Sequence, residues 1–158
     1  MSEERNPPSA FFQGLLAASV VLFLASLPWT SFRVNGSREG LPGWMVLLIG
    51  CLGLFDPGHP AHLAWLANPL LLLTWGMGMA RTGIGTRRAA VAAGGLALLL
   101  ALSFPLLRTV IVGDTGPSQV TGLGVGYWLW LASLGCGFAA DVTRWKTGAA
   151  LEREPIHA

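Results

Sequence analysis

Long apolar runs separated by short polar connections constrain the fold of this chain more than any other feature. The runs are 10–29, 41–55, 61–80, 89–107 and 121–140. Four of them hold about 20 residues, the length of a helix that crosses a bilayer core of about 30 Å. Only 11% of the residues are charged, whereas a soluble domain carries roughly 25%. The sequence therefore predicts an all-α integral membrane protein, because helices satisfy their own backbone hydrogen bonds in lipid.

The length of the second run, 41–55, does not decide whether it spans the membrane. It holds about 15 residues, which suits either a short span or a re-entrant segment. The expected fold is a bundle of five helical segments, with four full spans plus a short re-entrant segment as the alternative. We expect the connections 30–40 and 108–120 to be polar loops. The chain then divides into a polar N-terminal tail, a transmembrane bundle and a cytoplasmic C-terminal tail, at 1–9, 10–141 and 142–158.

Lysine and arginine are distributed unevenly between the two sides of such a bundle. With five spans, eight lie on one side and two, Arg5 and Arg108, on the other; with four spans the count is seven to three. Because Lys and Arg concentrate in cytoplasmic loops, both counts place the loop 81–88 and the C-terminus in the cytoplasm. The two counts disagree about the side of the N-terminus. The formal net charge of +2 gives no reason to expect a nucleic-acid partner.

One polar pair, Asn68-Pro69, interrupts the third run. Pro69 lacks a backbone N–H and clashes with the carbonyl four residues earlier, that of Trp65. An unpaired carbonyl in hydrocarbon costs several kcal/mol, and the amide of Asn68 can donate two hydrogen bonds to a neighbouring helix. We therefore expect a kinked helix pinned by this amide. The alternative is a hinge or a solute-coordinating site, because polar groups at mid-membrane depth are often functional.

A turn before the third run contains Asp56, His59 and His62. Carboxylate and imidazole groups suit zinc, copper or iron, and two histidines three positions apart could share one helix face. Metal binding or proton handling is one interpretation, with the metal unknown. A plain interfacial turn is the other, because Pro60 separates the histidines and Asp56 can cap the turn.

Small residues recur every four positions in the fourth and fifth runs. Helices in lipid associate through close contact at small residues and through a few polar bonds. Ala93, Ala97 and Ala101 share one face of the fourth run, and Ser133 and Gly137 share one face of the fifth. We expect these faces to pack together, although alanine and glycine are also simply common in such helices.

Aromatic residues gather near the ends of the runs. Trp65, Tyr127, Trp128 and Trp130 fit the aromatic belt that forms where a membrane meets water. A ligand-binding aromatic box is the alternative interpretation of the cluster that begins at Tyr127.

Two segments carry a resemblance to known proteins. They read Leu-Ala-Trp-Leu-Ala-Asn-Pro-Leu-Leu-Leu at 63–72 and Gly-Tyr-Trp-Leu-Trp-Leu-Ala-Ser at 126–133. Through them, the region 41–140 resembles a group of small, uncharacterised multi-helix proteins of the bacterial inner membrane. The resemblance implies that location and no activity. It favours five positions as important: Trp65, Asn68, Pro69, Tyr127 and Trp130.

The polar residues inside the runs limit the classes of function. Ion-coupled pumps need charged residues at membrane depth, and we expect none inside these runs. Ser103 and Ser133 have no histidine and acid at the same depth, so we predict no catalytic residue. Cys51 and Cys136 lie in apolar runs without a CxxC spacing and are expected to be free thiols.

Three functions remain open. The leading one is a non-catalytic accessory or assembly protein, without a cofactor, that docks in the bilayer against a membrane-protein partner or a second copy. The second is binding or transport of a small solute or metal through Asn68 and the His59/His62 entrance. The third is a membrane enzyme acting on a lipid or quinone, which a shortage of acid–base residues disfavours.

Overall fold

A computed structural model describes residues 10–35, 40–53, 60–80, 83–107, 109–111 and 117–151. In this part of the chain the structure is mostly helical, and the prediction of five helical segments is confirmed. The α-helices are α1 (Ala10–Ser26), α2 (Gly43–Gly53), α3 (Ala67–Met79), α4 (Ile84–Ser103) and α5 (Val125–Leu151). Two short 3₁₀ helices, η1 (Pro60–Leu66) and η2 (Phe104–Leu106), adjoin α3 and α4.

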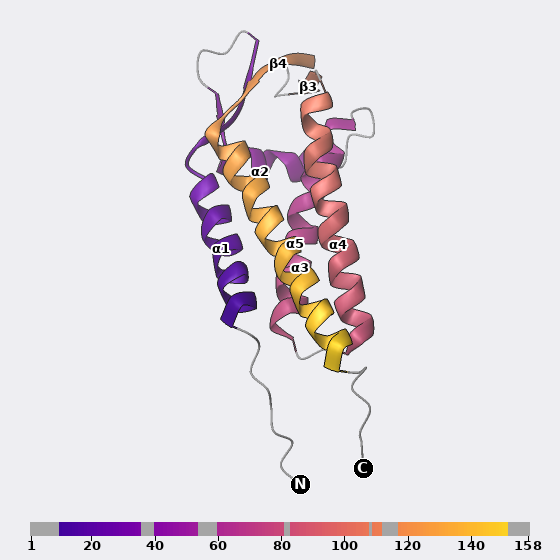
Figure 1. The fold of residues 1–158 in the computed structure, drawn as a ribbon. Helices are drawn as coiled ribbons and strands as arrows, with labels where there is room; N and C mark the ends of the chain where they lie inside the picture. The colour runs from indigo at the N-terminus through magenta and orange to yellow at the C-terminus, as the bar shows by residue number, and fades with distance from the viewer. Residues whose placement is uncertain are drawn as a thin grey trace, which may run out of the picture.

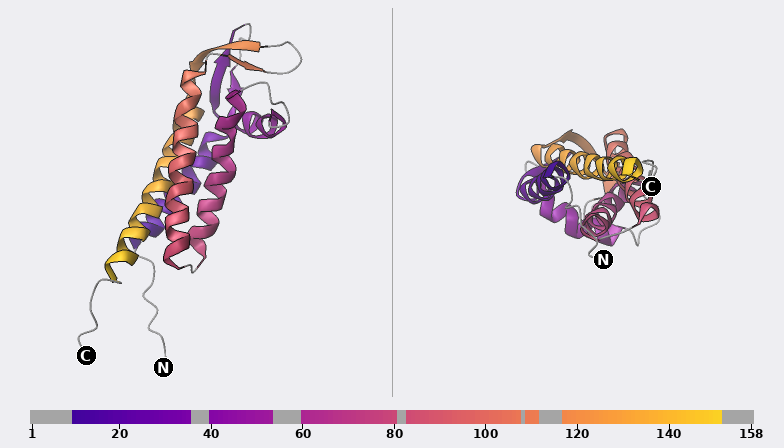
Figure 2. Two further views of the ribbon diagram at one scale, coloured as in Figure 1. Left: turned by 90° about the vertical axis from the view of Figure 1, so that its right-hand side faces the viewer. Right: turned by 60° about the horizontal axis from the view of Figure 1, so that its bottom comes forward.

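Four helices run lengthwise and one lies across them. Helices α1, α3, α4 and α5 follow a common long axis, whereas α2 lies crosswise near one end (Figures 1 and 2). With 11 residues, α2 is about 16 Å long, too short to cross a bilayer core. The second apolar run therefore does not extend along the bundle, which is the arrangement that the four-span alternative describes.

Length and composition separate the lengthwise helices into two classes. Within the described residues, two stretches are long and apolar enough to cross a membrane, Ile84–Leu106 and Val125–Gly148. Ala10–Ser26 and Leu63–Met79 are shorter apolar helices. At 17 residues, α1 is about 25 Å long and lies at the lower limit for a span.

The prediction of a wholly helical fold was right only in part, because the two connections expected to be loops form a small sheet together with the first residues of the second and fifth runs. Strands β1 (Thr30–Val34), β2 (Leu41–Pro42), β3 (Thr109–Ile111) and β4 (Pro117–Leu123) pair in the order β2-β1-β4-β3. All three pairings are antiparallel. The sheet covers one end of the bundle (Figure 1). Both connections leave the bundle at this end, so their backbone groups can pair with each other.

The fifth helix continues past the boundary expected at residue 141. Helix α5 reaches Leu151 and carries Asp141 within it, only 4% exposed. Arg144 holds this extension, since its guanidinium donates to the carbonyls of Met77 (2.5 Å) and Ala80 (2.6 Å) at the end of α3. The side chain of Arg144 thus satisfies carbonyls that a helix C-terminus leaves without partners.

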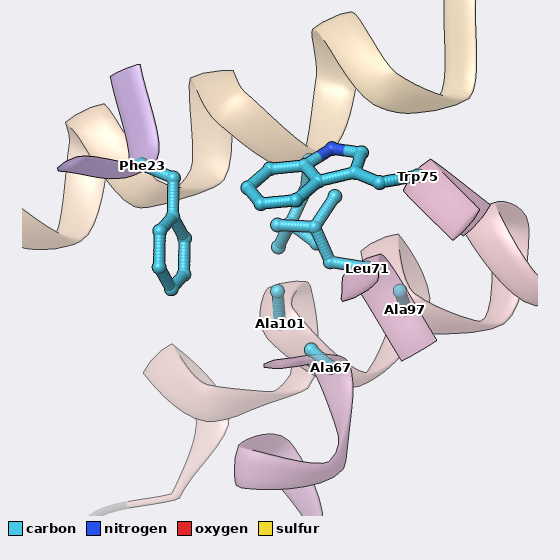
Figure 3. Packing of buried hydrophobic residues seen from close by; sticks show 7 residues of the cluster. Phe23, Ala67, Leu71, Trp75, Ala97 and Ala101 are labelled. Carbon is cyan, nitrogen blue, oxygen red and sulfur yellow. The ribbon is translucent and has the colours of Figure 1, made fainter. Parts of the chain in front are cut away.

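The core of the bundle combines one aromatic pair with small residues. Phe23 and Trp75 meet edge to face, with 5.5 Å between ring centroids, and Leu71 lies beside the indole (Figure 3). Ala97 and Ala101 of α4 are fully buried against this cluster. A second cluster lies under the sheet and contains Phe32, Val34, Ala64, Phe104, Val110 and Tyr127.

Candidate functional site

The Asn68-Pro69 pair lies where η1 passes into α3. Helix α3 begins at Ala67, so Pro69 occupies its first turn, where backbone N–H groups have no intrahelical partner. The proline therefore marks the junction of a 3₁₀ helix with an α-helix, not the middle of one long helix. The Nδ2 atom of Asn68 donates to the carbonyl of Trp65 at 3.0 Å, which is the carbonyl that Pro69 cannot pair with.

Two indole groups complete a hydrogen-bonded network around Asn68. The Nε1 atom of Trp130 donates to Oδ1 of Asn68 at 2.9 Å, which joins α5 to α3. The Nε1 atom of Trp65 donates to the carbonyl of Leu47 at 2.8 Å, which joins η1 to α2. A Cβ atom at Gly50 would overlap the Trp65 indole, so this glycine lets the ring pack close against α2.

A second proline is matched by a second side-chain donor. Pro105 cannot donate to the carbonyl of Ala101, four residues earlier. The phenol of Tyr127 donates to this carbonyl at 2.9 Å, and the N–H of Phe104 reaches it as well. At both proline positions, then, a polar side chain bonds the carbonyl that the proline leaves without its usual donor.

An apolar cavity of about 130 Å³ lies beside this network. It is lined by the end of α1, β1, α2, η1 with the start of α3, η2, β3 and the start of α5. Its walls include Asn68, Trp65, Tyr127 and Trp130. Four of the five positions that the resemblance favours thus meet at one cavity from three elements: Trp65 from η1, Asn68 from α3, and Tyr127 with Trp130 from α5.

The four aromatic residues expected in an interfacial belt face different ways. Trp128 points outward and is 55% exposed, whereas Tyr127 is buried. Trp65 and Trp130 are half-buried and hydrogen-bonded inside the bundle. Of the four, Trp128 alone is exposed enough to contact a membrane–water interface. The side chains of Trp65, Tyr127 and Trp130 instead donate hydrogen bonds to neighbouring segments.

The small-residue faces of the fourth and fifth runs also have different neighbours. Ala97 and Ala101 are buried in the core and Ala93 is half-buried, while Gly94 approaches Phe138 of α5. Ser133 and Gly137, however, face α1 and α3. A Cβ atom at Gly137 would lie 3.2 Å from Leu71 and from Ser19.

A buried serine links three helices at mid-bundle. The hydroxyl of Ser19 donates to the carbonyl of Ser133 at 2.8 Å and accepts from Nε1 of Trp75 at 3.0 Å. Nothing in the sequence around Ser19 distinguishes it from other serines in apolar runs, so this role becomes visible only in the tertiary structure. The hydroxyl of Ser133 is buried without a hydrogen-bond partner in the described structure.

Charged residues meet at the end of the bundle opposite the sheet. Arg144 interacts electrostatically with Asp141 and Arg87, and a Cβ atom at Gly148 would overlap the Arg87 guanidinium. Among described groups, Oδ2 of Asp141 and Nε of Arg87 have no hydrogen-bond partner. Asp141 directly follows the fifth apolar run, which itself contains no charged residue, but it lies inside α5 and is buried.

The histidine turn falls largely outside the description. Asp56 and His59 lie outside the described residues, and only the backbone of His62, in η1, is described. Within the described residues, no three His, Cys, Asp or Glu side chains come together to hold a metal. Cys51 and Cys136 are free and half-buried. Metal binding at this turn stays a prediction.

No protein-family model matches this chain, and no curated protein or solved structure matches it either. The resemblance to small proteins of the bacterial inner membrane therefore stays a prediction that rests on its two motifs.

Proposed function

We propose that this chain is a four-span integral membrane protein that assembles with a membrane-protein partner and catalyses no reaction. One observation carries the proposal: polar side chains at the centre of the bundle bond its own helices, while large apolar side chains cover its outside. Asn68, Ser19 and Tyr127 each join two or three segments. Such groups act as the polar bonds that hold helices together in lipid.

The outer surface supports placement in a bilayer. Large hydrophobic side chains on the four lengthwise helices are at least half exposed, among them Val21, Leu24, Leu72, Leu73, Leu99 and Leu102. A contiguous apolar exterior is unfavourable in water and marks a membrane or protein contact. In lipid it carries no such cost, because the surroundings are as apolar as leucine.

The charges support one orientation. The end opposite the sheet carries Arg87, Arg88, Arg144 and Lys146, and α1 begins at this end as well (Figure 1). This corresponds to the seven-to-three count, with both termini in the cytoplasm and the sheet on the other side. The resemblance adds the bacterial inner membrane as the location.

The described polar groups offer little support for the other two functions. Nδ2 and Oδ1 of Asn68 each make one hydrogen bond within the bundle, so only part of the bonding capacity of the amide is left for a solute. The phenol of Tyr127 also has an internal acceptor, which disfavours it as an acid for lipid or quinone chemistry. A partner in the membrane needs neither group, only the exposed apolar faces.

Site-specific photo-crosslinking tests this assembly role. Benzoylphenylalanine is placed in native membranes at Leu24, Leu72 or Leu99, outward-facing residues of α1, α3 and α4. We expect one position to yield a discrete protein adduct while the other two, as matched controls, yield only lipid adducts. An adduct of twice the chain mass would identify a second copy as the partner. Lipid adducts alone at all three positions would refute the proposal.

A further inference from the structure

We propose that the cavity beneath α2 holds part of a lipid acyl chain. The cavity, about 130 Å³, is close in size to an engineered apolar cavity of about 150 Å³ that binds benzene. It can therefore accept a short stretch of hydrocarbon, but not a whole lipid. The inference rests on the proposed placement in a membrane and is independent of the proposed partner.

Apart from Ser31, the residues with polar side chains in the cavity wall are hydrogen-bonded within the protein. The two indole nitrogens of Trp65 and Trp130 donate to internal acceptors, and each polar atom of the Asn68 amide makes one internal hydrogen bond. The hydroxyls of Ser26 and Tyr127 donate to the carbonyls of Phe23 and Ala101. A buried water needs two to four polar partners. The remaining surface is mainly carbon, which favours a hydrocarbon occupant over water.

The α2 wall of the cavity is also part of the outer surface of the bundle. Ile49 of α2 lines the cavity and is also 42% exposed. Its helix neighbours Leu48 and Trp44 are exposed as well. Helix α2 thus carries apolar side chains that line the cavity and others that face the surroundings of the bundle. In the proposed placement those surroundings are lipid, so the nearest supply of hydrocarbon is an acyl chain of the bilayer.

Lipid photolabelling of the full-length protein tests the proposal. The protein is placed in vesicles of phosphatidylethanolamine and phosphatidylglycerol that contain a phosphatidylcholine with a diazirine midway along one acyl chain. After irradiation, adducts are mapped by mass spectrometry of peptides. We expect adducts on Val46 and Ala64, which line the cavity, and also on the outward-facing Leu99.

Two filling variants and one control make the assignment specific. Ala64→Phe and Val46→Phe each fill the cavity, from η1 and from α2, and should abolish the cavity adducts. Leu99→Phe adds an aromatic ring on the outer surface of α4 and should leave them unchanged. If one filling variant does not fold, as judged by circular dichroism, the other still gives the test.

The outcomes separate failure of this inference from failure of the membrane placement. Adducts on Leu99 without cavity adducts would overturn the lipid site while leaving the placement standing. Absence of adducts at both places would overturn the placement too. Cavity adducts that persist in both filling variants would also refute the proposal. Cavity labelling only by a small diazirine-bearing aromatic probe added from water would assign the cavity to a free apolar molecule and overturn the lipid site.

Discussion

The indole nitrogen of Trp130 donates a hydrogen bond to the amide oxygen of Asn68, 2.9 Å away, and so joins α5 to the first turn of α3. The same amide donates to the carbonyl of Trp65, which Pro69 cannot pair with. The side chain of Asn68 thereby supplies a donor to a carbonyl that the proline leaves without one, and it also connects two helices. This dual use predicts that the two bonds depend on each other.

Replacing Asn68 with leucine, which has a similar shape, should lower the stability of the bundle by about 1–3 kcal/mol. The change leaves the Trp65 carbonyl and the Trp130 indole with one hydrogen bond fewer. Thermal unfolding in detergent, followed by circular dichroism, measures the loss. Trp130→Phe should cost much less in the Asn68→Leu background than in the native chain. Additive losses would show that the two groups are not coupled.

Tyr127→Phe should destabilise the chain by about 0.6–1.7 kcal/mol, because the Ala101 carbonyl loses its side-chain donor. In a Pro105→Ala background this loss should shrink, since residue 105 regains the N–H that normally reaches that carbonyl. The same unfolding measurement on the two single variants and the double variant completes the cycle. An equal loss in both backgrounds would mean that Tyr127 does not compensate for the proline.

Ala97→Leu should weaken the bundle by about 1–3 kcal/mol, because overpacking a closely packed core forces neighbouring groups apart. Ala97 is fully buried among Leu71, Trp75 and Leu134. Ala92→Leu is the matched control, because Ala92 lies on the exposed side of the same helix. Equal melting temperatures for the two variants in detergent would contradict the packing of α4 described above.

Cysteine labelling in intact cells should report the orientation of the bundle. In a background without Cys51 and Cys136, Gln119→Cys in β4 should react with a membrane-impermeant maleimide added outside. Lys146→Cys in α5 should react only after the membrane is permeabilised, because the basic end is expected in the cytoplasm. Both native side chains are exposed, so access is comparable. The reverse pattern would invert the proposed orientation.

Several features of the fold follow from local sequence. Each of the five apolar runs contains a helix, because a long apolar stretch in lipid must satisfy its backbone hydrogen bonds internally. The break near Asn68 and the need of the Trp65 carbonyl for a donor follow from proline chemistry alone. That the donor is Asn68 itself, and that Trp130 bonds the same amide, could not be deduced from sequence.

The sheet left a signal that a search for apolar runs does not detect. Phe32, Arg33 and Val34 alternate between buried, exposed and buried positions, the period of a strand with one covered face. A strand this short needs partners, however, and β1 finds them about 10 and 90 positions away along the chain, in β2 and β4. The glycines near 124 also indicate a close approach of two segments at the sheet. A Cβ atom at Gly126 would lie 2.5 Å from the carbonyl of Trp29.

The sequence by itself determined the apolar character of the chain, its helical segments and the sites of its proline breaks. These depend on composition and on backbone groups a few residues apart. Only the tertiary structure decided that α2 lies crosswise, that Tyr127 and Trp130 turn inward and that a cavity remains between them and α2. Each of these depends on which distant segments come into contact, and the energies of such contacts cannot be read from one segment alone.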